Sequence, residues 1–320
     1  MWQATDSSVW QGRIDTEDGA AGMRWHQLIQ PAADGPPGVC LLGLASDRGV
    51  ALNQGRPGAS AGPAALRCAL ANLAAHGQRP LYDAGDVHAD DNLPAAQTAY
   101  AERAAEILTA GHFLIGLGGG HEIGWAGFQG ARRFLDQHQP GRRLGILNFD
   151  AHFDLRRPAP HASSGTPFFQ AAEWCREQQL PFDYACIGIS ESANTRALFA
   201  TAAELGVDFL LDRDCTAQGA AQLIGKLVDR VDALYVTVCL DVLPASVAPG
   251  VSAPAALGIA PGFVIDCLHQ AAQACRAAEC RWLLADIAEL NPAYDLDGRS
   301  ARIAARLAWE IERALEALLA

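Results

Sequence analysis

Short apolar runs alternate along this chain with alanine- and leucine-rich stretches of helical periodicity. GVCLLGL at 38–44, FLIGLGGG at 113–120 and RLGILNFD at 143–150 have the first pattern, whereas GPAALRCALANLAAHG at 62–77 has the second. The runs at 184–189, 208–212, 233–241 and 281–290 continue the alternation with short connections. A mostly parallel sheet buried between two layers of helices produces such a sequence, and binding groups then collect beyond the carboxyl ends of the strands. The pattern therefore predicts an α/β protein and directs attention to the strand ends.

The alternation contains no linker, repeat or low-complexity tract, so we expect a single catalytic domain over residues 38–320. Residues 1–37 differ, because they are rich in turn-forming residues and carry the scattered Trp2, Trp10 and Trp25. We interpret them as an N-terminal arm that packs on the body. The last segment, 299–320, has apolar residues at helical spacing and predicts a helix with one core-facing side.

Composition and charge narrow the class of partner. Half of the 320 residues are hydrophobic and 19% are charged, which suits a folded core. With 24 basic against 36 acidic residues and no basic run, we expect a small-molecule substrate, and neither a nucleic acid nor a membrane as partner. The sequence leaves open whether copies of the chain form a homo-oligomer.

Cysteine usage and the start of the chain bear on its compartment. The first residues lack the features of a signal peptide, and no apolar segment reaches about 18 residues, so we expect a cytoplasmic protein. The nine cysteines lack paired spacing and are expected to be reduced thiols. All except Cys239 are most simply small buried hydrophobes.

The strongest chemical signal is LNFDAHFDLR at 147–156. Asp150, His152 and Asp154 stand at alternate positions, so an extended backbone would point all three side chains to one side. Two carboxylates and an imidazole packed so closely resist desolvation unless a cation neutralises them. The segment therefore favours a metal site, the alternative being a hydrogen-bonded polar cluster.

Three further strand ends carry polar residues. His121 follows Gly118 to Gly120 and is either a ligand or an ordinary structural histidine, while the glycines lack the spacing of a nucleotide-binding loop. Cys239 and Asp241 stand two residues apart at the end of the run 233–241. Asp286 and Glu289 precede a proline turn at the end of the run 281–290, where a carboxylate could instead cap the turn.

Three segments resemble the signatures of the ureohydrolases, the arginase and agmatinase family of binuclear manganese enzymes. They are GGGHE at 118–122, FDAHFD at 149–154 and CLDVLPASVAPGVSAP at 239–254. Finer features at 47–67, 163–168, 188–195 and 288–307, together with Arg156, resemble the formimidoylglutamase branch of that family. Arginases have a histidine proton donor about where this chain reads GTPF at 165–168, which argues against arginase itself. The resemblance implies a three-layer α/β/α fold around a mainly parallel eight-stranded sheet.

The resemblance also implies a ligand set for two Mn²⁺ ions. His121 and Asp154 would bind one ion, His152 and Asp241 the other, and Asp150 would bridge them. Cys239 stands where the family pattern has a second bridging aspartate, which puts the second metal site in doubt.

The implied reaction is hydrolysis of N-formimidoyl-L-glutamate to L-glutamate and formamide. Two metal ions would activate a water molecule to attack the amidine carbon. Glu289 would hold the formimidoyl nitrogens through charge-assisted hydrogen bonds. A guanidino acid or agmatine is the alternative substrate.

Two other interpretations of Cys239 stay open. Loss of the second metal would leave a non-catalytic relative. Alternatively, Cys239 could act as a covalent nucleophile, although the surrounding acids would raise the pKa of its thiol.

A substrate with two carboxylates needs local positive charge in this acidic chain. Arg156 and Arg56 are the candidates, because guanidinium groups bind carboxylates through two parallel hydrogen bonds. Either could instead form an ordinary surface ion pair. Asn53 and Thr166 are weaker candidates for substrate contact.

Overall fold

The computed structural model describes residues 1–31, 35–89, 91–316 and 318. In that part of the chain, ten strands form one sheet in the order β1-β4-β3-β5-β10-β9-β6-β7-β8, and β2 also pairs with β4. All pairs are parallel except that of β1 with β4. The strands are β1 (Trp2–Gln3), β2 (Ile29–Pro31), β3 (Val39–Ala45), β4 (Leu81–His88), β5 (Phe113–Gly118), β6 (Leu144–Phe149), β7 (Asp183–Ile189), β8 (Asp208–Leu211), β9 (Ala233–Cys239) and β10 (Arg281–Ala288).

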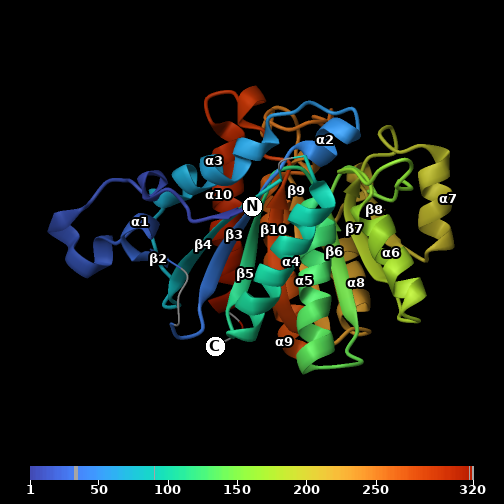
Figure 1. Cartoon of the computed structure of the whole chain (residues 1–320), viewed down its shortest axis with the longest axis horizontal. Coiled ribbons are helices and arrows are strands. Elements are labelled where there is room, and N and C mark those ends of the chain that lie inside the picture. Colours follow the sequence, from blue (N-terminus) through green and yellow to red (C-terminus); the bar gives the residue numbers. More distant parts are fainter. Residues whose placement is uncertain (32–34, 90, 317, 319–320) are drawn as a thin grey trace.

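Helices connect these strands and cover both faces of the sheet (Figure 1). The α-helices are α1 (Trp25–Leu28), α2 (Arg48–Leu52), α3 (Gly62–Ala71), α4 (Leu93–Thr109), α5 (Ile123–His138), α6 (Pro167–Glu177), α7 (Arg196–Glu204), α8 (Ala217–Val228), α9 (Pro261–Ala277) and α10 (Arg299–Glu316). Six 3-10 turns complete the described chain: η1 (Ser7–Val9), η2 (Thr16–Gly22), η3 (Ala59–Ala61), η4 (Asp212–Asp214), η5 (Leu240–Val242) and η6 (Pro292–Tyr294).

The three-layer α/β/α fold is confirmed, but the expected eight strands are too few. The seven apolar runs correspond to β3 and β5 to β10. Strand β4 was not identified, because Asp83 and Asp86, which pair with Arg67, interrupt its apolar residues. Residues 1–37 add β1 and β2 at the outer edge of β4. Strands of two and three residues are too short to show an alternating pattern and were not predicted. The division into an arm and a body at residue 37 stays a prediction.

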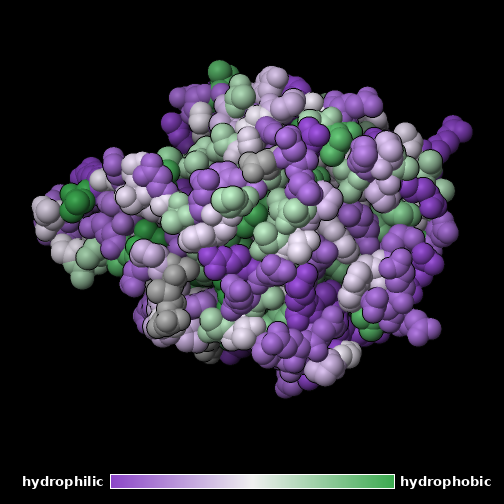
Figure 2. All heavy atoms as spheres, in the orientation of Figure 1, coloured by the Kyte–Doolittle hydropathy of each residue, from purple (hydrophilic) through white to green (hydrophobic). Residues whose placement is uncertain are grey.

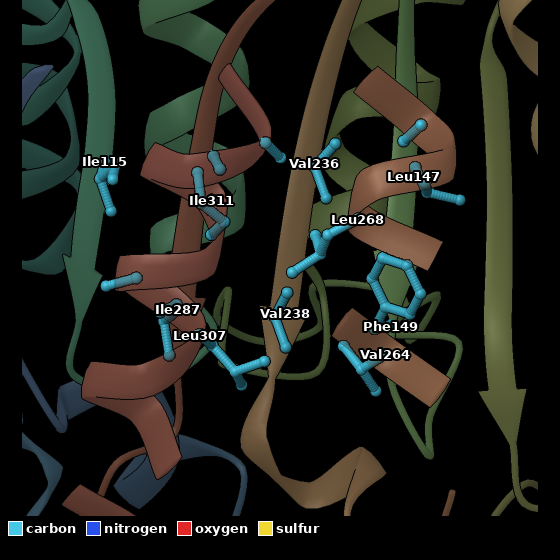
Figure 3. Close-up of a cluster of buried hydrophobic side chains, with 14 of the residues drawn as sticks. Ile115, Leu147, Phe149, Val236, Val238, Val264, Leu268, Ile287, Leu307 and Ile311 are labelled. Atoms are coloured by element: carbon cyan, nitrogen blue, oxygen red, sulfur yellow. The ribbon is translucent and has the colours of Figure 1, made fainter. Parts of the chain in front are cut away.

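Two hydrophobic clusters fill the spaces between the sheet and its helical layers. One unites the sheet with α3, α8, α9 and α10, and the other unites it with α4 to α7. In the first cluster, Val236 and Val238 of β9 lie between Ile287 of β10 and Phe149 of β6, beneath side chains of α9 and α10 (Figure 3). The expected core-facing stripe of the last helix is present, since Leu307, Ile311 and Leu315 are at most 2% exposed.

The surface in view is mostly hydrophilic, with hydrophobic residues scattered over it (Figure 2). Crossing a membrane requires a longer and more apolar helix than any of those described. All nine cysteines are free, as expected. Cys68 is exposed and Cys215 only partly buried, so the expectation of burial was wrong for these two.

Candidate active site

Four adjacent strands at the centre of the sheet deliver the candidate residues to one place. In sheet order they are β5, β10, β9 and β6, all parallel, so their carboxyl ends lie side by side. His121 follows β5, Glu289 follows β10, and Asp241 follows β9, while Asp150 follows β6. Residues 168 positions apart in sequence therefore meet, as the hydrogen bond from the His121 amide to Glu289 Oε1 demonstrates (2.9 Å).

The glycines before His121 serve close backbone packing. The Gly119 amide donates to Leu44 O (2.9 Å), and Gly119 O accepts from the Glu289 amide (2.8 Å), so this turn is tied to the ends of β3 and β10. A Cβ at position 119 would lie 1.8 Å from the carbonyl oxygen of Ser46, so only glycine fits. The turn thereby holds His121 in place.

The segment Asp150–Asp154 reaches the site by a different route from the one expected. Strand β6 ends at Phe149, the next residues bend, and Asp154 has a φ of 50°, so the interpretation as an extended run with one polar face was wrong. The bend itself is stabilised by Asp150 Oδ1, which accepts the His152 amide at 2.7 Å. The three side chains still converge, because the chain curls around Asp150.

Cys239 and Asp241 also differ from expectation. Cys239 is the last residue of β9, and Asp241 lies in η5, so the two do not share a strand face. Nevertheless both are buried, at 1% and 4% exposure, and both line the same cavity.

His121 Nδ1 lies 2.9 Å from Asp150 Oδ2 and 2.9 Å from Asp154 Oδ2. Neither contact has hydrogen-bond geometry, so this nitrogen is a buried polar atom without a hydrogen-bond partner among the described residues. One nitrogen thus lies within 3 Å of two carboxylate oxygens without pairing with either. Atoms arranged in this way suit a cation, which can attract all three at once.

The opposite nitrogen of this imidazole explains its orientation. His121 Nε2 lies 2.9 Å from Thr237 Oγ1, and Thr237 Oγ1 donates to Asp286 Oδ1 at 2.7 Å. Because the threonine proton is used in that second bond, Nε2 carries the hydrogen and donates to Thr237. Nδ1 is then the nitrogen that faces the carboxylates. Burial alone would lower the pKa of His121, but Asp150 and Asp154 raise it well above its ordinary value, so Nδ1 is the atom that would hold either a proton or a metal ion.

A second group of candidate ligands shares Asp150 with the first. His152 Nδ1 lies 3.1 Å from Asp241 Oδ2 and 3.4 Å from Asp150 Oδ1. The ligand atoms of Asp150, His152 and Asp241 lie within 4.8 Å of one another, and so do those of His121, Asp150 and Cys239. Two neighbouring positions with one carboxylate in common are therefore available to metal ions.

The charges at this site are unbalanced without a cation. Burial, with the charge of Asp150, raises the pKa of Asp154 to about 6, and the same causes raise the pKa of Asp241. Burial alone would lower the pKa of His152, but Asp241 and Asp150 raise it well above its ordinary value. Four carboxyl groups face the imidazoles of His121 and His152; they belong to Asp150, Asp154, Asp241 and Glu289. Even two imidazolium ions would therefore leave negative charge in this buried place.

Glu289 stands at a strained position directly after β10. It has a φ of 69°, and it is 4% exposed. Its Oε1 accepts the His121 amide, whereas Oε2 has no hydrogen-bond partner among the described residues. Burial and the nearby Asp241 and Glu122 raise the pKa of Glu289 to about 8. Such a carboxyl group is suited to receive a cationic N–H group.

A cavity of about 310 Å³ opens above these residues. Arg156 and Asn53 line it, and no described residue forms a hydrogen bond or ion pair with the guanidinium group of Arg156. Its stem passes close to residue 165, where a Cβ would lie 2.9 Å from Arg156 Cδ, so Gly165 makes room for it.

The side chains of Arg56 and Thr166 already have partners within the protein, which the sequence did not indicate. The Arg56 guanidinium donates to the carbonyl oxygens of Val251 and Ser252, and it stacks over the Tyr294 ring at 4.1 Å. Arg56 therefore holds two loops together, although it still lines the cavity. The Thr166 hydroxyl is buried and bonds within its own turn, to Ser163 O (2.9 Å) and Gln170 Oε1 (2.8 Å). Substrate contact by either residue stays a prediction.

Sequence reasoning overlooked Thr237 entirely and gave Asp286 no specific role. Thr237 stands two residues before Cys239 in β9, so alternation along the strand was the available signal. Its bond to His121 joins residues 116 positions apart, and no local pattern could reveal it.

A model of the arginase family matches residues 37–312. The chain belongs to the arginase family. It is 49% identical over 308 residues to formimidoylglutamase of Hahella chejuensis, covering 95% of this chain and 94% of that protein. It is 50% identical over 314 residues to formimidoylglutamase of Aeromonas hydrophila, covering 96% of this chain and 97% of that one. Among solved structures, Trypanosoma cruzi formiminoglutamase with Mn²⁺ has the same fold, with a TM-score of 0.79 and 24% identity over 92% of this chain and 98% of that one.

Proposed function

We propose that this chain hydrolyses N-formimidoyl-L-glutamate to L-glutamate and formamide with the aid of two Mn²⁺ ions. Formimidoylglutamases at about half identity over nearly the whole chain support this assignment. The observation that carries it is the convergence of His121 Nδ1 with Asp150 and Asp154, beside a second set that shares Asp150. We also propose that the enzyme is soluble and cytoplasmic and that its substrate is a small molecule.

The donor atoms present fit a pair of divalent ions. His121 and Asp154 would hold one ion and His152 and Asp241 the other, with Asp150 between them. Cys239 would contribute a thiolate to the shared position. When bound, the ions would supply a nucleophile at neutral pH by lowering the pKa of water. Oxygen and nitrogen donors are acceptable to Mn²⁺, and the thiol is the one soft donor in the set.

The remaining residues would orient the substrate. Glu289 Oε2, unpaired and facing the cavity, would accept the N–H groups of the amidinium, so that the amidine carbon lies over the acidic cluster. Thr237 and Asp286 would hold His121 Nδ1 toward the acidic cluster. Water adds across the amidine C=N bond. The proton of the added hydroxyl then passes to the glutamate nitrogen as the bond between that nitrogen and the amidine carbon breaks, which gives formamide and the free amine of L-glutamate.

The test measures formamide release from N-formimidoyl-L-glutamate. Protein stripped of metal should be inactive, and added Mn²⁺ should restore turnover. Asp150→Asn should lower kcat by about 10³-fold or more, because it removes the shared carboxylate. Asp214→Asn, a change at an exposed acid that does not line the cavity, serves as the control.

Arginine and agmatine should be poor substrates. Full activity of rigorously metal-free protein would refute the metal-dependent mechanism. Faster turnover of agmatine than of formimidoylglutamate would refute the substrate assignment.

A further inference from the structure

A second cavity of about 470 Å³ lies beside the acidic one. Asn53, Arg156 and Leu198 line both cavities and so form the wall between them. The remaining lining comes from Leu52 of α2, from the loop between β6 and α6, and from Thr195 and the first turns of α7.

The two cavities differ in charge. Asp154, Asp241 and Glu289 line the first together with Arg56 and Arg156, whereas the described lining of the second has no acidic residue. Arg156, Arg157 and His161 line the second. Positive charge thus collects on the far side of the shared wall in a chain with a net charge of −12. The pair of cavities therefore matches a ligand that is cationic at one end and anionic at the other.

Arg156 and Arg157 both have guanidinium N–H groups available to a ligand. Neither guanidinium forms a hydrogen bond or ion pair with another described residue. Arg157 lies over the ring of Phe169, 5.0 Å from its centre, which holds the guanidinium plane while its edges stay available. The nearby Glu173 is paired with Arg176 at 2.8 Å. The hydrogen bond from Arg176 is the main cause of the lowered pKa of Glu173, with a smaller contribution from Arg157.

Resting on the proposed function, we propose that the second cavity binds the dicarboxylate portion of the substrate, with Arg156 on the α-carboxylate and Arg157 on the distal carboxylate. The α-carboxylate is carried by the carbon next to the amidine nitrogen, so it belongs at the wall between the cavities, where Arg156 lies. The distal carboxylate is two methylene groups further out, which corresponds to Arg157. Arg157 would then determine specificity for a substrate with two carboxylates.

Substrate analogues separate the two arginines. N-formimidoyl-L-norvaline lacks the distal carboxylate, and N-formimidoyl-γ-aminobutyrate lacks the α-carboxylate. Arg157→Gln should raise KM for formimidoylglutamate about tenfold or more, the effect of one lost charged hydrogen bond, with kcat nearly unchanged. Its KM for the norvaline analogue should match that of the wild type within about twofold, since that analogue has nothing for Arg157 to bind.

Arg156→Gln should show the complementary pattern. It should raise KM for formimidoylglutamate and for the norvaline analogue, and it should leave KM for the γ-aminobutyrate analogue unchanged. Arg157→Lys should recover part of the lost affinity if charge is what matters. Arg133→Gln, at an exposed arginine of α5 that lines neither cavity, is the matched control and should change neither KM. If Arg157→Gln raises KM equally for the full substrate and the norvaline analogue, Arg157 acts only by packing on Phe169 and the proposal is wrong.

Calorimetric binding of glutarate and butyrate tests the cavity without turnover. Wild-type protein should bind the dicarboxylate more tightly, and Arg157→Gln should remove that difference. If formimidoylglutamate is not hydrolysed but the glutarate preference depends on Arg157, the proposed function fails while the dicarboxylate site stands. Equal binding of glutarate by the wild type and Arg157→Gln would overturn the site, whatever the enzyme hydrolyses.

Discussion

Among single residues, Cys239 distinguishes this site from an all-carboxylate bridge. Cys239 is 1% exposed, and its sulfur lies within 4.8 Å of ligand atoms of His121 and Asp150. Burial, with the charges of Asp150 and Asp241, raises the pKa of the thiol well above its ordinary value. Ionisation of this thiol therefore depends on a bound cation. Sulfur is a softer donor than carboxylate oxygen, so the site should bind Zn²⁺ and Fe²⁺ more tightly relative to Mn²⁺ than an all-carboxylate site does.

We predict that Cys239→Asp raises manganese content toward two ions per chain and increases manganese-dependent kcat, because it restores a hard oxygen donor at the shared position. Elemental analysis after dialysis, together with formamide release, measures both effects. Cys68→Asp, at an exposed cysteine, is the matched control. If the wild type already keeps two Mn²⁺ ions and Cys239→Asp changes neither content nor rate, the thiol does not limit the site.

Among helices and strands, the sequence predicted which segments form strands better than it predicted which strands lie side by side. Each central strand is a short, continuously apolar run, so local pattern was sufficient to find it, and so were the polar residues that follow it. The order β5-β10-β9-β6 depends on contacts between distant segments, which local periodicity does not encode. The family resemblance implied that the polar residues after these strands share two metal ions, but it gave no strand order. The bend at Asp150–Asp154 and the role of Arg56 as a clamp depend on individual hydrogen bonds and could not be predicted from spacing.

Helix α10 contains two buried acids, Glu310 and Glu312, of which Glu310 pairs with His269 and Arg306. Glu312 is 2% exposed, and its two carboxylate oxygens have no hydrogen-bond partner among the described residues. The chain at Gly77 packs directly against it, since a Cβ there would overlap Glu312 Oε1. Burial raises the pKa of Glu312 from 4.5 to about 7. The folded protein therefore holds this proton more tightly than the unfolded chain does, and its stability falls as pH rises from about 4.5 through 7.

We predict that Glu312→Gln raises the free energy of unfolding by about 1–3 kcal/mol at pH 8, where wild-type Glu312 is charged and buried, and by much less at pH 5. Urea denaturation at the two pH values measures the difference. Glu204→Gln, at an exposed position at the end of α7, should show no such dependence. A Glu312→Gln effect of equal size at both pH values would show that its charge is not the cause.

At the scale of the whole molecule, one sheet unites the acidic and basic cavities. The loops that line them emerge from the same end of the parallel strands, while the two hydrophobic clusters fix those strands from both faces. The chemistry is thus confined to one rim, and the rest of the molecule holds that rim in place.

The short strand β1 has a consequence for the behaviour of the protein in solution. Trp2 and Gln3 pair with Val87 and Asp86, and the amino terminus donates to His88 O at 2.7 Å, so the first residues occupy the main-chain groups along the outer edge of β4. An uncovered strand edge is a template on which other chains add strands and aggregate. We predict that deleting residues 1–5 leaves metal binding intact but produces concentration-dependent aggregates, detected by light scattering. Replacing Trp2 and Gln3 by alanine keeps the backbone pairing and should aggregate far less; equal aggregation of both variants would show that the side chains, and not the strand edge, protect the protein.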